Sequence, residues 1–60
     1  MEYRLNVLWN DNSEELLYES STKGKNNTIN ILKNLSDVKR ITCYSILKDG
    51  NIGKIEVISR

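Results

Sequence analysis

The sequence contains no histidine and no proline, and Cys43 is its only cysteine. A single cysteine excludes a disulfide within the chain and is typical of a reducing compartment. Without histidine, one thiolate cannot supply the three or four ligands that a zinc ion takes. We therefore expect a cytoplasmic protein that holds no metal and no other cofactor.

The chain also lacks length and long apolar runs. Its 60 residues suffice for one domain, residues 1–60, and a chain of this size buries only ~60% of its unfolded surface. Such domains usually gain stability from disulfides, metals or further copies of the chain, so we expect a homo-oligomer. No apolar run approaches the ~18 residues of a membrane span, and residues 1–4 lack the basic start of a signal peptide. We expect no membrane partner.

Neither sign of charge dominates, because the formal net charge is +1. This balance argues against a general nucleic-acid binder. The distribution is uneven: residues 1–19 hold one basic and five acidic residues, net −4, and residues 20–60 hold eight basic and three acidic residues, net +5. Such asymmetry either orients a partner or a second copy, or reflects two solvated faces that differ in charge.

Two strands are predicted in the first third of the chain. In residues 3–9, alternate side chains are apolar β formers, which predicts a half-buried strand. The polar cluster at residues 10–13 predicts a turn. Residues 14–20 allow two interpretations, because Asn12 and Glu15 could begin a helix as a capping box. Few residues remain for a helix before the Ser-Ser-Thr stretch, so we predict a second strand.

The pairing of these two strands depends on the length of the loop. If residues 10–13 form a four-residue loop, apolar pairs lie on one face and an opposite-charge pair lies on the other, which are favourable cross-strand combinations. The predicted pairs are Val7 with Leu16, Leu5 with Tyr18, and Arg4 with Glu19.

One helix is predicted, over residues 26–36. It follows residues 20–25, which have the composition of a linker with helix-capping residues. Its apolar stripe has the spacing i, i+3, i+4 and i+7 and consists of Thr28, Ile31, Leu32 and Leu35. One stripe of this width covers one face of a sheet.

Residues 38–60 predict a long hairpin that closes at residues 48–51, where Asp-Gly is a strong turn signal. Two registers are possible, and they differ in which residues of the last strand face the helix. A two-residue turn places Glu56 opposite Cys43, whereas a three-residue loop places Val57 there. Only the second leaves an apolar inner face, so we predict the three-residue loop, residues 49–51.

The predicted fold class is α+β, with the order β-β-α-β-β: a four-stranded antiparallel sheet of two hairpins, with one helix packed on one face. The other face of this sheet would be open to a partner. Its apolar residues would be Leu8, Leu17, Tyr44, Ile46 and Ile58. A continuous exposed patch of this kind often marks a protein-interaction surface, unless the charged residues between its members separate them.

Catalytic groups are scarce. A nucleophile needs a base beside it, and Cys43 lies in the inner row of a predicted strand, where a core role is expected. Asp11, Glu14 and Glu15 lie on or beside a turn, where they would be solvated, and they lack the spacing of a calcium loop. We expect the protein not to be an enzyme.

A second candidate site is basic. It would use Lys23, Lys25, Lys33, Lys39 and Arg40 to contact an anion, a nucleotide or a nucleic acid. Residues 21–26 precede the predicted helix as a phosphate loop does, but the glycine pattern of that loop is incomplete. An ordinary linker is the alternative interpretation.

The composition, which has no alanine, phenylalanine or proline and much asparagine, lysine and isoleucine, resembles that of small accessory proteins carried by phages and mobile elements of AT-rich bacteria. This resemblance lies in composition and assigns no residue a role. It implies a protein that occupies a host factor. The first hypothesis is therefore a non-catalytic interaction module, an inhibitor of a host defence protein by steric occupation, acting as a homodimer. The second hypothesis is the anion or nucleic-acid binder.

Overall fold

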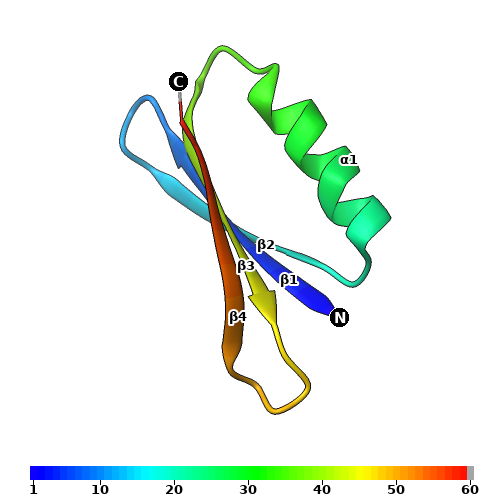
Figure 1. Ribbon diagram of the computed structural model, residues 1–60. Coiled ribbons are helices and arrows are strands. Elements are labelled where there is room, and N and C mark those ends of the chain that lie inside the picture. The colour runs from blue at the N-terminus through cyan, green and yellow to red at the C-terminus, as the bar shows by residue number, and fades with distance from the viewer. Residues whose placement is uncertain (60) are drawn as a thin grey trace.

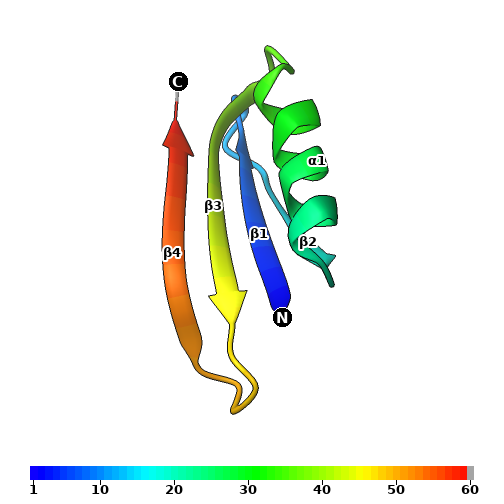
Figure 2. The same cartoon turned by 45° about the vertical axis from the view of Figure 1, so that its right-hand side comes forward.

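The computed structural model describes residues 1–59, and its elements follow the predicted order. The elements are β1 (Glu2–Trp9), β2 (Glu14–Glu19), α1 (Thr22–Lys33), β3 (Val38–Ile46) and β4 (Ile52–Ser59). The strands form one antiparallel sheet in the order β2-β1-β3-β4 (Figure 1). Helix α1 lies across one face of the sheet, and no described element covers the other face (Figure 2). The predicted α+β fold is confirmed.

The core lies between α1 and the two central strands. Alternate residues of β1 and β3 point toward the helix, as the period of two in a strand requires. The buried apolar side chains are Tyr3, Leu5, Val7, Leu32, Val38, Ile41 and Cys43. Helix α1 contributes Leu32 to this group, and Ile29 packs against it, so the attachment of the helix depends partly on polar contacts.

The register of the β1–β2 hairpin differs from the predicted one by one residue. Leu5 lies opposite Leu17, and Arg4 lies opposite Tyr18 rather than Glu19. A slip of one residue moves every side chain of a strand to the other face. Leu17 is therefore on the helix-covered face, and Leu16 and Tyr18 are on the open face.

The reason for this slip is the loop, which contains three residues rather than four. The Trp9 N–H donates to the Ser13 carbonyl at 2.9 Å, and Asn12 has a positive φ of 68°. This is the form of a three-residue hairpin loop that ends in a left-handed residue. Asp11 accepts hydrogen bonds from the Ser13 N–H and hydroxyl, which hold the pKa of the Asp11 carboxyl below its ordinary value.

The predicted register of the β3–β4 hairpin is also wrong. Glu56, not Val57, lies opposite Cys43. The turn contains three residues, 48–50 rather than the predicted 49–51, because the Leu47 N–H donates to the Asn51 carbonyl at 2.8 Å. The turn and the strands thus belong to registers that differ by one residue.

A β-bulge between the turn and the strands accounts for this difference. Ser45 of β3 faces both Gly53 and Lys54 of β4, between the pairs Tyr44–Ile55 and Ile46–Ile52. Such a bulge places two residues of one strand opposite one residue of its neighbour. The Ser45 hydroxyl accepts a hydrogen bond from the Lys54 N–H at 2.7 Å and donates to the Lys54 carbonyl at 3.5 Å.

Helix α1 begins four residues earlier than predicted and ends three residues earlier. Ser21 is its N-cap, since the Ser21 Oγ accepts a hydrogen bond from the Gly24 N–H at 3.0 Å. The predicted linker therefore holds the first helical turn. The stripe that faces the sheet is rotated relative to the prediction, because Ile31 is 65% exposed whereas Lys25 is 8% exposed.

Candidate functional site

The open face of the sheet is apolar where β3 meets β4. The cross-strand pairs Tyr44–Ile55 and Ile46–Ile52 lie on this face, and Val57 lies opposite Thr42 in the next row. We define the open-face patch as Tyr44, Ile46, Ile52, Ile55 and Val57. The three β4 members are 45%, 55% and 59% exposed, in sequence order. A single exposed isoleucine is ordinary, but adjoining ones on an uncovered face are typical of an interaction surface.

The face becomes mixed toward β2. Arg4 lies between Tyr18 and Tyr44 in one cross-strand row, and its guanidinium carbon is 5.3 Å from the centroid of the Tyr44 ring. This distance is within the range of a cation–π contact. Beyond Arg4, Tyr18 is 69% exposed and Leu16 is 45% exposed. The open-face patch therefore has a polar border on its β1 side, with further exposed apolar surface beyond it.

The structure separates the predicted interaction residues into two groups. Leu8, Tyr44 and Ile46 lie on the open face. Leu17 and Ile58 lie on the helix-covered face and pack against the core, so their predicted placement is wrong. The physical reason is the one-residue difference in register of each hairpin.

The same register differences place on the open face five residues that the sequence pattern predicts to face inward or does not assign: Leu16, Tyr18, Ile52, Ile55 and Val57. One signal in the sequence could have identified the β4 members. Gly53 stands inside a predicted strand, where an isolated glycine often marks a bulge. A bulge at Gly53 combined with a three-residue turn at residues 48–50 gives the observed register.

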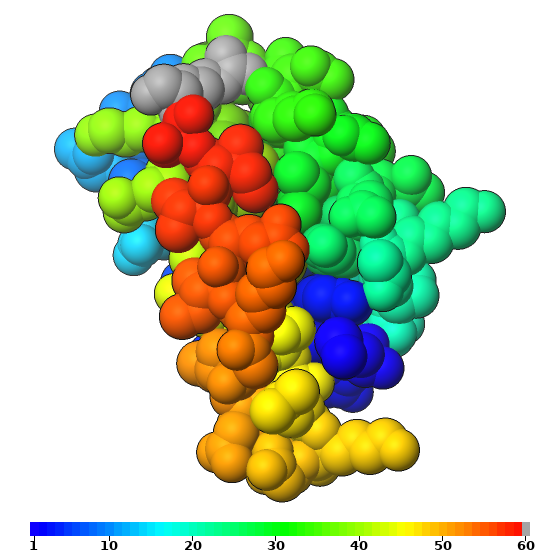
Figure 3. Space-filling model, viewed as in Figure 1, coloured from blue at the N-terminus to red at the C-terminus, as the bar shows by residue number. Residues whose placement is uncertain are grey.

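The two free edges of the sheet differ in length and charge. β2 has six residues, and Glu14, Glu15 and Glu19 are three of them. β4 has eight residues, with Lys54 and Glu56 as its charged members. Short, strongly charged edges discourage pairing with another strand, whereas long edges with few charges permit it. Strand β4 runs uncovered along the surface of the molecule (orange to red in Figure 3).

The backbone N–H and C=O groups of β4 point alternately to β3 and to the free edge of the sheet. The Lys54 N–H points to β3, where it meets the Ser45 hydroxyl. The peptide groups of successive residues in a strand point to opposite sides. Those of Glu56 therefore point to β3 as well, and those of Ile55 and Val57 point to the free edge.

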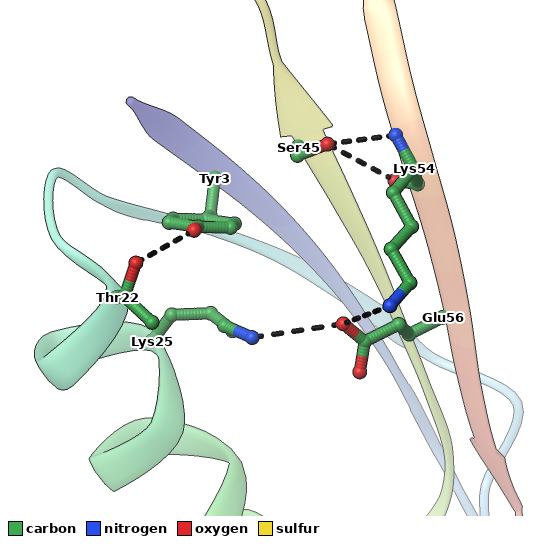
Figure 4. Close-up of polar contacts among 6 residues, drawn as sticks. All are labelled: Tyr3, Thr22, Lys25, Ser45, Lys54 and Glu56. Atoms are coloured by element: carbon green, nitrogen blue, oxygen red, sulfur yellow. Dashed lines mark hydrogen bonds and ion pairs between the residues drawn. The ribbon is translucent and has the colours of Figure 1, made fainter.

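A polar cluster connects α1 to β4 on the helix-covered face of the sheet (Figure 4). The Lys25 Nζ lies 3.6 Å from the Glu56 Oε1 and 5.0 Å from the centroid of the Tyr3 ring. The Lys54 Nζ lies 4.0 Å from the same oxygen of Glu56. The Tyr3 hydroxyl and the Thr22 Oγ1 share a hydrogen bond of 2.8 Å. The buried ammonium is thus satisfied within the fold, and we interpret the cluster as a structural link.

Cys43 lies next to this cluster and is 2% exposed. Burial raises the pKa of the Cys43 thiol, an effect that the nearby Lys25 charge opposes and Glu56 reinforces. The nucleophilic form of cysteine is the thiolate, and reactive cysteines are usually partly exposed and have a lowered pKa. Its environment favours the protonated, unreactive form.

The five predicted basic residues are not brought together. Lys25 points into the fold, where it meets Glu56. Arg40 lies opposite Leu8 and Ser59, on the open face. Lys23 and Lys33 belong to α1, which covers the opposite face, and Lys39 is an exposed residue of β3. The expected single basic surface is therefore divided between the two sides of the sheet.

The chain matches no protein-family model, no curated protein and no solved structure. No helix within residues 1–59 has the length and apolar character needed to cross a membrane. In the same part of the chain, no three His, Cys, Asp or Glu side chains are grouped so that they could hold a metal ion. The candidate site is thus defined by the geometry of this chain alone.

Proposed function

We propose that the protein is a non-catalytic interaction module that binds a partner protein through the open-face patch. The observation that supports this proposal is the row of large apolar side chains on an uncovered sheet face, with Ile52, Ile55 and Val57 each at least 45% exposed. Apolar surface that is bordered by polar groups has the character of an interface core with its rim.

The patch could supply substantial binding free energy. Fully burying an exposed isoleucine or valine side chain contributes about 1.5–3 kcal/mol, and about half of each β4 side chain of the patch remains to be buried. Tyr44 and Arg4 are of the residue types that most often dominate binding energy, and they are already in contact on this face. Part of the gain offsets the loss of freedom on association, so a complex of moderate affinity is expected.

Such a module would act by occupying the surface of its partner. The buried thiol of Cys43 and the ion-paired Lys25 offer no activated nucleophile. A single free cysteine suits the cytoplasm. Together with the compositional resemblance, these features support an inhibitor of a host defence protein that works by steric occupation.

The test compares one substitution on each face. Ile46→Lys places a charge in the open-face patch, whereas Ile31→Lys does so at a 65% exposed position of α1. Immobilised wild-type chain and both variants are incubated with bacterial lysate, and bound proteins are quantified by mass spectrometry. We expect the specific partner to bind Ile46→Lys at least tenfold more weakly, which corresponds to about 1.4 kcal/mol. Binding to Ile31→Lys should be unchanged.

The folded state of each variant is checked by circular dichroism before the comparison. A partner that binds all three proteins equally would contradict the proposal. Loss of binding in Ile31→Lys, with Ile46→Lys unaffected, would assign the interaction to the helix instead.

A further inference from the structure

We propose that the free edge of β4 pairs with β4 of a second copy of the chain, antiparallel and centred on Ile55. The two sheets of four strands would then join into one continuous sheet of eight. This inference rests on the proposed function as an interaction module, because it assigns one of the module's surfaces to a partner of defined identity.

The backbone of β4 is suited to this pairing. The peptide groups of Ile55 and Val57 point to the free edge, as the direction of the Lys54 N–H requires. A two-fold axis at Ile55 places the N–H of each Ile55 against the carbonyl of the other. A pair of this kind exchanges two hydrogen bonds, whereas a register centred on Glu56 would bring together groups already directed to β3.

Of these registers of two β4 strands, only the one centred on Ile55 places charges of opposite sign opposite each other. Centring on Ile55 sets Lys54 opposite Glu56 of the second copy, and Glu56 opposite its Lys54. Centring on Lys54 or on Glu56 would place like charges directly opposite each other, which is destabilising. Centring on Val57 would place Glu56 opposite Ile58. The Lys54 and Glu56 side chains are 76% and 41% exposed, so both can reach across the joint.

The side chains on the open faces of the two copies also fit together where the β4 strands meet. Ile55 meets Ile55 of the second copy, and Val57 lies opposite Gly53, where no side chain obstructs it. A two-fold axis perpendicular to the sheet keeps both helices on one side, as in other interfaces in which the same surface of both copies meets. The two open-face patches then adjoin and form one apolar surface of about twice the area.

The other free edge is unsuited to the same role. A β2–β2 pairing would bring Glu14, Glu15 and Glu19 of two chains close together, and the strand is two residues shorter than β4. Repulsion between like charges and a short edge both act against such a pairing. The inference therefore concerns β4 alone.

The first test uses proline to remove one backbone N–H from the free edge of β4 or of β2. Val57→Pro deletes an N–H that points to the free edge of β4, so that it should disturb pairing with a second copy without removing a hydrogen bond of the chain. Leu16→Pro is the matched control on the β2 edge, because the Ser13 carbonyl points to β1 and the peptide group of Leu16 therefore points away from it. Masses in solution are measured by light scattering over a hundredfold range of concentration.

We expect wild type and Leu16→Pro to have the mass of two chains, and Val57→Pro to have the mass of one chain. A wild type that remains a monomer throughout would overturn the inference. A Val57→Pro variant that remains a dimer would also overturn it. So would loss of the dimer in both proline variants, if both keep the circular dichroism of the wild type.

The second test uses charge exchange and does not depend on proline. Lys54→Glu and Glu56→Lys each create like-charge pairs in a homodimer centred on Ile55, so each alone should dimerise at least tenfold more weakly. Mixed together, they restore two opposite-charge pairs, and a heterodimer of wild-type affinity should form. Glu56→Lys also removes the ion-pair partner of Lys25, so the circular dichroism of both variants is compared with that of the wild type. Failure of the folded variants to associate when mixed would exclude this register.

The outcomes for the two proposals are distinct. Ile46→Lys lies in β3, away from the edge, and should leave the dimer intact while it weakens partner binding. A dimer that Ile46→Lys abolishes and Val57→Pro does not would be a face-to-face sandwich, and it would overturn the edge inference. A monomeric wild type that still binds its partner through the open-face patch would leave the proposed function standing by itself.

Discussion

The Ser45 hydroxyl accepts a hydrogen bond from the backbone N–H of Lys54 at 2.7 Å. This contact lies at the bulge that sets the register of β4. Without the extra residue there, Glu56 would move to the open face and Val57 would face the helix. One hydroxyl therefore supports the arrangement that gives the sheet its apolar open face.

Replacing this hydroxyl should destabilise the protein. Ser45 is 8% exposed, and Ser45→Ala leaves the Lys54 N–H without its hydrogen-bond acceptor. We expect the free energy of unfolding to fall by about 1–2 kcal/mol, as for other hydrogen bonds lost in a buried setting. Urea unfolding measures it, with the exposed Ser59→Ala as control, expected within about 0.5 kcal/mol of wild type. Equal effects of the two variants would contradict the role of Ser45.

The turn of the same hairpin should be sensitive to a side chain at Gly50. Its φ is +87°, in the left-handed region, and there is open space around the position where a Cβ would lie. The cost of Gly50→Ala is then conformational and should be about 1–2 kcal/mol. Gly50→Asn should cost less, because asparagine tolerates this conformation. Thermal unfolding of both variants tests the order, and an alanine variant as stable as the asparagine variant would exclude backbone strain as the cause.

Lys25 should stabilise the fold more through its alkyl chain than through its charge. The residue is 8% exposed and lies over the Tyr3 ring, whereas the side chain of Glu56 is 41% exposed and stays hydrated without its partner. We expect Lys25→Met, which keeps the chain length, to be within about 1 kcal/mol of wild type. Lys25→Ala should cost about 2 kcal/mol through lost packing. Urea unfolding that shows equal losses would assign the effect to the ion pair.

Stability should decline at alkaline pH because of Cys43. Burial raises the pKa of this thiol in the folded state above its value in the unfolded chain. Its contribution is then fully present below the ordinary thiol pKa of about 8.5 and is lost as the pH rises from there through the folded-state pKa. Unfolding measured between pH 7 and pH 10 should show a smaller decline for Cys43→Val than for wild type. Identical profiles would contradict this assignment.

The strands and the order of the elements could be predicted from local pattern. Alternation along β1 and β3 places apolar residues such as Leu5 and Ile41 on one face, and either register of their neighbours preserves that face. The helix itself was also predictable, but its first turn was not. Ser21 was one of several candidate caps, and Lys25 was not expected to face the sheet.

The registers of the edge strands could not be predicted from the same pattern. Leu16 is followed by Leu17, and Val57 is followed by Ile58, so either register of each strand turns one apolar residue inward and one outward. Hydrophobic alternation gives no preference between such alternatives. The candidate site is affected most, because both strands contribute to the open face.

The fold class follows from the sequence alone, because the positions of its apolar residues and turn residues are local properties of the chain. It did not determine the order of the strands, so the central position of β1 and β3 is known from the structure. The face of β2 and of β4 that meets the helix is known from the folded chain and not from its pattern of apolar residues. For β2 the choice depends on the left-handed Asn12 in its loop, and for β4 it depends on the bulge at Ser45 and the pairing of Lys25 with Glu56. The bulge forms only when β3 and β4 pair, and the Lys25–Glu56 contact joins elements that are distant in the chain, so their free energies exist only once the elements have assembled.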